Sequence, residues 1–247
     1  GLYVHTKMYL NEWVDFDTHL EKIKDGIKKN KKIINPFISL SLIDDPEMHF
    51  KIAKKFSENI LISNNYKREN RNADDKIKIG YFSADFNKHA VSRLIYKMLC
   101  FHNKKKFKIY SYAYGFDKED DLHNLIKKEV DVYRDIRDIG DHDVALLAKK
   151  NNLDIAIDLQ GYTDKSRLSI FANKVAPIQI NYLGYPGTMG SKYIDYIVAD
   201  QNLIPEKNYK FYSEKIIFMP HHYQVQNNEL KISKAPLTKE DLGLPKD

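Results

Sequence analysis

The chain has 247 residues, of which 43% are hydrophobic and 12% aromatic, so it can bury a sizeable core in one large domain or in one domain with an appendage. The formal net charge of +6 comes mainly from lysines interleaved with acidic residues, a pattern of solvated helix faces, so nucleic acid is not among the partners we expect. No apolar run approaches the roughly 20 residues of a membrane-spanning helix, and the first residues lack a signal-peptide core, so we expect a cytoplasmic protein without a membrane partner.

Two helices are predicted near the start of the chain. Apolar residues at helical spacing predict the first helix, and they are Phe16, Leu20, Ile23 and Ile27. A loop containing Pro36 is expected next. Asp45 followed by Pro46 has the pattern of an N-cap and a first helical residue, and predicts a second helix up to about Phe56. We assign residues 1–63 to a helical segment and the polar stretch 64–76 to a linker.

From residue 77 onward, short apolar runs alternate with amphipathic stretches. The predicted strands are Ile77–Phe82, Phe107–Tyr112, Val130–Ile136, Ile155–Leu159, Ile178–Leu183, Ile194–Ala199 and Lys215–Met219. The predicted helices between them are Val91–Phe101, Leu122–Glu129 and Val144–Lys150. This alternation predicts an α/β fold for residues 77–247, a Rossmann-like, doubly wound and mostly parallel sheet covered on both faces.

Polar residues follow the first predicted strand, in the segment GYFSADFNKHAVS. The segment lacks the G-x-G-x-x-G fingerprint of dinucleotide-binding proteins. It places Ser83, Asp85 and His89 between a strand and a helix. The near-neutral pKa typical of histidine suits a general base, but His89 or Asp85 at this position can equally serve as a helix cap.

Two further polar loops follow later strands. The first, DLQGYTDKSR, brings Asp158, Gln160 and Tyr162 to a strand end, although a polar connection that only caps the next helix has the same composition. The second lies within Ala176–Asp200 and is a turn rich in glycine and proline that includes Tyr185. Because ligands bind at the carboxyl ends of the strands in open α/β sheets, convergence of the three loops predicts a functional crevice.

The remaining candidate ligands do not predict a metal site. The single cysteine, Cys100, excludes an internal disulfide framework and a cysteine-based zinc site. Two Asp-x-Asp pairs and one histidine pair remain, and they are Asp15–Asp17, Asp141–Asp143 and His221–His222. We interpret the aspartates as helix caps, because acidic residues stabilise helix N-termini, and the histidines as structural.

The three loop segments together resemble the catalytic region of the O-linked N-acetylglucosamine transferase (SPINDLY-like) family. The matching signatures are G-Y-x-S-x-D-F-x-x-H, D-L-x-G-Y-T and A-P-I-Q-x-x-x-L-G-Y-P-G-T-x-G, the last followed by D-Y-I-x-x-D. The resemblance extends to EWVDFDTHLEKI, PFISLSLIDDPEMHFKIAKKF and YSEKIIFMP, and so covers nearly the entire chain.

The resemblance implies the first lobe of a GT-B glycosyltransferase, with residues 77–247 as the N-terminal catalytic lobe. It implies inverting, metal-independent transfer of N-acetylglucosamine from UDP-N-acetylglucosamine to serine and threonine hydroxyls of proteins, without a cofactor. The partners would be a UDP-sugar donor and a protein or peptide acceptor. His89 matches the position of a proposed catalytic base. The substrate-binding positions we expect are Asp85, Asp158, Gln160, Tyr162, Leu183, Gly184, Tyr185, Pro186 and Thr188.

The chain also departs from the family pattern. Ala90 replaces the proline that usually follows the motif histidine. The final residues, LTKEDLGLPKD, resemble a segment that in the family leads into a second lobe with most of the nucleotide contacts. We therefore expect a fragment that lacks the donor-binding half and is inactive alone. A related transferase with another sugar-nucleotide donor, and a non-catalytic peptide-binding lobe, stay open as alternatives.

Overall fold

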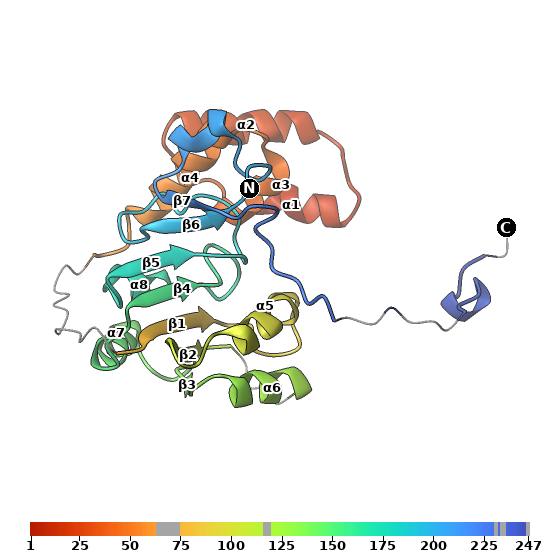
Figure 1. The fold of residues 1–247 in the computed structure, drawn as a ribbon. Helices are drawn as coiled ribbons and strands as arrows, with labels where there is room; N and C mark the ends of the chain where they lie inside the picture. The colour runs from red at the N-terminus through yellow and green to blue at the C-terminus, as the bar shows by residue number, and fades with distance from the viewer. Residues whose placement is uncertain (63–74, 116–119, 230–231, 233–235, 246–247) are drawn as a thin grey trace.

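A computed structural model of the chain describes residues 1–62, 75–115, 120–229, 232 and 236–245. Its centre is a seven-stranded sheet with the order β3-β2-β1-β4-β5-β6-β7 (Figure 1). The strands are β1 Ile77–Ser83, β2 Phe107–Ala113, β3 Val132–Asp135, β4 Ile155–Asp158, β5 Ile178–Asn181, β6 Tyr196–Ala199 and β7 Lys215–Phe218. Every neighbouring pair is parallel. The predicted Rossmann-like α/β fold is confirmed.

The helices follow the predicted alternation, with additions. They are α1 Leu2–Tyr9, α2 Phe16–Lys28, α3 Pro36–Leu42, α4 Pro46–Ser57, α5 Ala90–Phe101, α6 Asp121–Glu129, α7 Asp141–Lys150 and α8 Leu168–Ala172, with 3-10 turns η1 Glu206–Phe211 and η2 Glu240–Leu242. The predicted N-cap at Asp45 is confirmed, since its side chain accepts a hydrogen bond from the Met48 amide at 3.1 Å. No helix in these described ranges is long and apolar enough to cross a membrane.

The loop predicted around Pro36 is wrong, because this proline begins α3. The side chain of Asn35 accepts a hydrogen bond from the Phe37 amide at 2.8 Å and so caps the helix. Proline at the first helical position costs no hydrogen bond, because the first amides of a helix have no partner within it. An Asn-Pro pair is therefore as good a helix start as the Asp-Pro pair that follows it.

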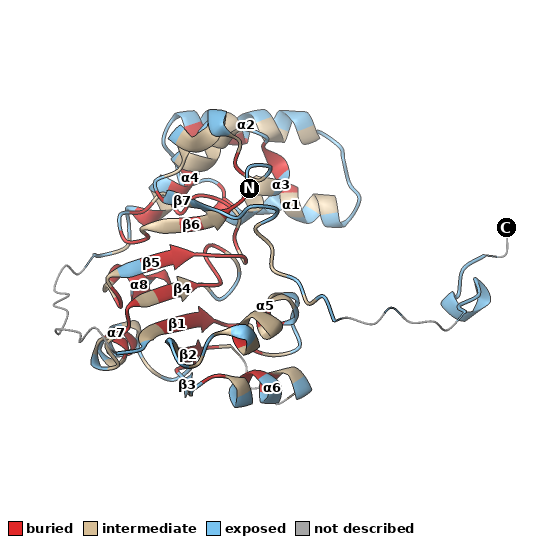
Figure 2. Ribbon diagram, in the orientation of Figure 1, coloured by how far each residue is buried: buried red, intermediate tan, exposed pale blue. Residues whose placement is uncertain are grey.

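Two hydrophobic clusters cover the two faces of the sheet. The buried strand residues lie mainly in β1, β2, β4 and β5, whereas the edge strands β3 and β7 are more exposed (Figure 2). Ile95 and Leu99 of α5 and Ile126 of α6 belong to one cluster. The other contains residues of α7 and α8, together with Ala53 of α4. Helices therefore cover both faces, as the doubly wound pattern requires.

The helical segment lies at the β6–β7 end of the sheet (Figure 1) and is joined to it through α4. Ala53 is completely buried in the core, and the Ser57 hydroxyl donates to the Gly190 carbonyl oxygen at 2.7 Å. A Cβ on Gly190 would lie 2.3 Å from the Lys54 nitrogen, so only glycine allows this approach. Most of the predicted linker 64–76 lies outside the described residues, and the division at residue 63 stays a prediction.

The segment after β7 returns across the carboxyl ends of the strands. One oxygen of Asp200, just after β6, accepts a hydrogen bond from the Tyr223 amide at 2.8 Å. The Tyr182 hydroxyl, just after β5, donates to the Tyr223 carbonyl at 3.0 Å. Tyr223 then packs against the cluster that includes α5. Val225 packs against the same cluster, and Glu229 forms an ion pair with Lys97 of α5. The described residues 236–245, which include η2, extend away from the sheet (Figure 1).

Candidate active site

The three predicted loops begin at one edge of the sheet. β4 lies between β1 and β5, and the strand order reverses between β1 and β4. In the registers of these pairs, Asp158 lies beside Phe82 on one side and beside Asn181 on the other. The loops that follow β1, β4 and β5 therefore leave neighbouring strands in the same direction. This is the topological switch point at which open α/β sheets bind ligands.

Gln160 ties the first two loops together across this point. Its Oε1 accepts a hydrogen bond from the Ala84 amide at 3.1 Å, and its Nε2 donates to Asp85 Oδ2 at 3.0 Å. The same Nε2 donates to the Asp164 carbonyl at 2.8 Å. Gln160 is only 4% exposed. Both ends of a buried amide are thus paired, which fixes the β1 loop relative to the β4 loop.

His89 is the exposed group of the site. It occupies the N-cap of α5, where its Nδ1 accepts a hydrogen bond from the Val91 amide at 3.3 Å. Asp85 Oδ2 lies 3.6 Å from the same Nδ1. The imidazole is 47% exposed, whereas the Asp85 side chain is 14% exposed. His89 therefore caps α5, as one of the two predicted roles requires, and its exposed ring remains accessible to a substrate.

Asp158 is buried beneath the β4 loop. It is 1% exposed, its Oδ1 accepts from the Gln160 amide at 2.9 Å, and its Oδ2 has no partner among the described residues. Burial raises the pKa of this carboxyl to about 6, because the charged form loses its hydration. In this conformation Asp158 shapes the start of the loop and is not in contact with solvent.

Tyr162 holds the β4 loop against two other parts of the chain. Its hydroxyl shares its proton between the carbonyl oxygens of Met189, at 2.8 Å, and Ala53, at 3.1 Å. Its ring meets the Tyr185 ring edge-on, with centroids 5.3 Å apart. Tyr162 is 6% exposed and Tyr185 1%. Both rings are therefore packed in the core under the crevice.

The turn from Leu183 to Gly190 is shaped by tight backbone contacts. Leu183 has a positive φ of 73°, and a Cβ on Gly184 would lie 2.0 Å from the Leu159 carbonyl oxygen. Only glycine fits there without moving the β4 loop. Pro186 is half-buried and lines a cavity of about 300 Å³ between this turn, α4 and η1.

Thr188 directs its hydroxyl toward a buried carboxylate rather than into open space. It donates to Glu214 Oε2 at 2.8 Å, while Glu214 Oε1 accepts from the Met189 amide at 2.6 Å. Glu214 is 5% exposed, and burial raises its pKa. No local motif singles out Glu214, although it lies within the matching segment YSEKIIFMP.

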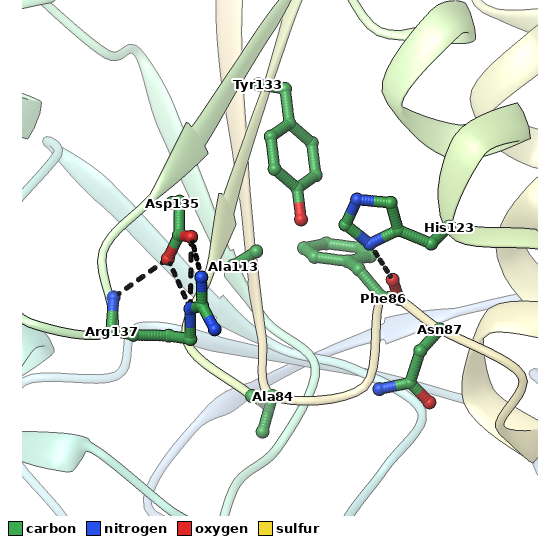
Figure 3. Close-up of a pocket in the computed structure, with 9 residues that line it drawn as sticks. Ala84, Phe86, Asn87, Ala113, His123, Tyr133, Asp135 and Arg137 are labelled. Carbon is green, nitrogen blue, oxygen red and sulfur yellow. Dashed lines mark hydrogen bonds and ion pairs between the residues drawn. The ribbon is translucent and has the colours of Figure 1, made fainter. Parts of the chain in front are cut away.

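A small pocket opens beside the β1 loop, at the ends of β2 and β3 (Figure 3). His123 Nδ1 donates to the Phe86 carbonyl on its wall at 3.1 Å. Arg137 Nε donates to both carboxylate oxygens of Asp135, at 2.9 and 3.0 Å. The two opposite charges on this wall therefore neutralise each other, and none of the predicted site residues lines this pocket.

The predicted aspartates lie at the starts of α2 and α7, but neither helix is capped by a side-chain hydrogen bond. Asp15 occupies the N-cap position of α2 with a left-handed backbone, but its side chain makes no capping hydrogen bond. Asp141 lies in the first turn of α7, after Gly140, and its carboxylate accepts from Arg167 Nε at 2.7 Å. These acidic groups are placed to act on the helix dipole through charge. Within the described residues, no group of three or more His, Cys, Asp or Glu side chains could hold a metal ion.

Comparison with known proteins gives a consistent set of matches. The family model described as Glycosyl transferase family 41 matches residues 12–234. The chain is 27% identical to the probable UDP-N-acetylglucosamine–peptide N-acetylglucosaminyltransferase SEC of Arabidopsis thaliana, over 99% of this chain and 27% of that protein. It is 30% identical to the Caenorhabditis elegans UDP-N-acetylglucosamine–peptide N-acetylglucosaminyltransferase, over 60% of this chain and 13% of that protein.

Other matches agree. The probable UDP-N-acetylglucosamine–peptide N-acetylglucosaminyltransferase SPINDLY of Oryza sativa subsp. japonica is 32% identical over 61% of this chain and 17% of that protein. A solved structure of a mutant Thermobaculum terrenum O-GlcNAc transferase superposes with a TM-score of 0.68 at 24% identity, over 73% of this chain and 35% of that one. That structure shares the fold. The chain thus spans between 13% and 27% of the length of these curated relatives.

Proposed function

Since this chain belongs to glycosyl transferase family 41, we propose that it forms the acceptor-side lobe of an enzyme that transfers N-acetylglucosamine from UDP-N-acetylglucosamine to serine and threonine hydroxyls of proteins. One observation carries the proposal. The three segments with the family's signatures are far apart in the sequence, yet the structure brings them to neighbouring strand ends at the switch point of the sheet.

The proposed reaction assigns a role to the exposed imidazole. The acceptor hydroxyl oxygen forms a bond to the anomeric carbon as the bond from that carbon to the UDP oxygen breaks, with inversion. The hydroxyl proton passes to His89 Nε2, and UDP leaves with the bonding electron pair. A base must lie within hydrogen-bond reach of the proton it takes, and an imidazole that is 47% exposed at the N-cap of α5 is open to such an approach.

The buried residues would contribute by fixing the shape of the crevice. Gln160 and Tyr162 hold the β4 loop through paired hydrogen bonds, and Glu214 holds the turn that contains Thr188. Rigid loops keep an acceptor hydroxyl in near-attack geometry, which lowers the barrier because orientation is set before the reaction. In this proposal Tyr162 and Thr188 support the pocket from beneath.

We also propose that residues outside these 247 make most of the contacts with the nucleotide. The longer lengths of the curated relatives support this, because they leave room for a second lobe. Donor and acceptor must be held together for transfer. The chain alone would then bind the UDP-sugar weakly and have negligible transferase activity.

Isothermal titration of UDP-N-acetylglucosamine into this chain tests whether the donor site lies outside these 247 residues. We expect no binding in the micromolar range. Micromolar binding by the 247 residues would overturn the proposed location of the donor site. Titration into the natural protein that contains this chain is the matched experiment, and donor profiling of that protein separates N-acetylglucosamine from another transferred sugar.

A further inference from the structure

His89 Nδ1 stands between two competing partners. The Val91 amide donates to it at 3.3 Å, and Asp85 Oδ2 lies 3.6 Å away. An Nδ1 that accepts a hydrogen bond carries no proton, so the proton of the neutral ring is on Nε2. In that tautomer Nε2 is a donor and cannot take a proton from a hydroxyl. The capping arrangement therefore holds His89 in the wrong form for a base.

The competing arrangement gives the other tautomer. A movement of Nδ1 by roughly half an ångström toward Asp85 brings the pair into hydrogen-bond range. Nδ1 then donates its proton to the carboxylate, and the lone pair of Nε2 becomes free. A carboxylate selects the tautomer of a catalytic histidine in this way in the Ser-His-Asp triad.

The carboxylate itself is held in place for this contact. Gln160 Nε2 donates to the same Oδ2 at 3.0 Å, from the neighbouring strand's loop. The Asp85 amide donates to the Ser83 hydroxyl oxygen at 2.9 Å, which fixes the backbone. The Asp85 side chain is largely buried, whereas His89 is half exposed. The imidazole can therefore rotate toward a carboxylate that does not move.

From these contacts we propose that Asp85 is a positioning residue that draws His89 out of its capping role into the tautomer with an unprotonated Nε2, with Gln160 holding Asp85 from the adjacent loop. This inference rests on the proposed function for its catalytic consequence. The tautomer itself is a property of the chain and is measured without any substrate.

The first test is nitrogen-15 NMR of labelled histidine side chains in this chain at pH 8. We expect a measurable population of the Nδ1–H tautomer of His89. The isosteric variant Asp85→Asn should reduce that population at least fivefold, since a neutral amide attracts the proton less than a carboxylate does. Asp164→Asn is the matched control, because Asp164 meets Gln160 through its backbone carbonyl. A wild-type ring entirely in the Nε2–H form overturns the proposal without any variant, as does an unchanged ratio in Asp85→Asn.

The second test is kinetic and uses the natural protein that contains this chain. In Asp85→Asn we expect the kcat for transfer to a peptide to fall about 100-fold or more, by analogy with the wrong-tautomer variant of the serine protease triad, with the KM for the donor unchanged. The double variant with His89→Ala should be no slower than His89→Ala alone, because Asp85 acts only through His89.

The outcomes of the kinetic test separate the two proposals. Additive losses in the double variant overturn the role of Asp85. A wild-type protein that transfers no sugar overturns the proposed function, and the NMR ratio then decides the tautomer proposal by itself.

Discussion

The residues grouped by their motifs into one site divide into two regions with opposite exposure. The β1 loop presents an imidazole that is 47% exposed. The β4 loop and the turn after β5 bury most of their named side chains, with Tyr162 6% and Thr188 2% exposed, whereas Pro186 is half-buried. The comparison shows that residues of the same family motifs have two different roles. The exposed residue can react with a substrate, and the buried residues fix the backbone of the loops around the site.

Gly184→Ala should have the largest effect on stability, because it adds a side-chain atom where the buried backbone leaves no space. Its new Cβ would meet the Leu159 carbonyl oxygen at 2.0 Å. We expect the free energy of unfolding to fall by about 3 kcal/mol or more, the upper range for overpacking. Gly140→Ala is the matched control, since its Cβ would have no neighbour closer than 3.9 Å. Urea denaturation measures both, and equal midpoints for the two variants would refute the close approach.

Asp158→Asn should change how stability depends on pH. The folded pKa of about 6 lies above the value of 3.8 for a free carboxyl, so the folded state binds the proton more tightly. Stability is therefore highest below pH 4 on account of this group and falls as pH rises to about 6. The rise in the pKa from 3.8 to about 6 corresponds to a loss of about 3 kcal/mol in the free energy of unfolding between pH 4 and pH 6. The asparagine variant should lose this decline, measured by denaturation between pH 4 and pH 8.

Asp200→Asn is the control for that experiment, because the pKa of Asp200 is shifted in the opposite direction from that of Asp158. Backbone hydrogen bonds from Leu203, Tyr223 and Asn202 lower the pKa of Asp200, so its stabilisation is present at neutral pH and is lost as pH falls. The asparagine variant should be less stable than wild type at pH 7. If both variants shift stability in the same direction at pH 8, the contrast between the two carboxylates is wrong.

Tyr162→Phe and Tyr185→Phe compare two buried phenols that touch each other. Removal of the Tyr162 hydroxyl leaves two buried carbonyl groups without that donor, and should cost about 1–2 kcal/mol. The Tyr185 hydroxyl has no partner among the described residues, so its removal should be neutral or stabilising. Thermal unfolding of the pair checks the order, and a reversed order would contradict the assigned contacts.

Much of the fold was predictable because the strands are short apolar runs with clear ends. The run Ile178–Leu183 was predicted too long, since β5 ends at Asn181. The chain turns there, with the Gly184 amide donating to the Tyr182 carbonyl at 3.0 Å. Local composition does not reveal such a turn, because Tyr182 and Leu183 are as apolar as the strand they follow.

The internal support of the site was not predictable from local patterns. Gln160 reaches Asp85 across 75 positions of the sequence, and Glu214 reaches Thr188 across 26. Motif spacing identified both loops but not the contacts between them. These contacts depend on strand order, which places β4 beside β1 and β5 and which no single segment encodes.

His89→Asn should have the smallest effect on stability and therefore isolates the chemistry of the exposed region. Asparagine is a good N-cap, so the start of α5 is preserved and the free energy of unfolding should change by less than about 0.5 kcal/mol. The most direct test of the account is the transfer rate of this variant in the natural protein, with labelled UDP-N-acetylglucosamine and a serine-containing peptide. We predict a loss of at least about 100-fold, the range for a general base. A rate within threefold of wild type would contradict the assignment of His89.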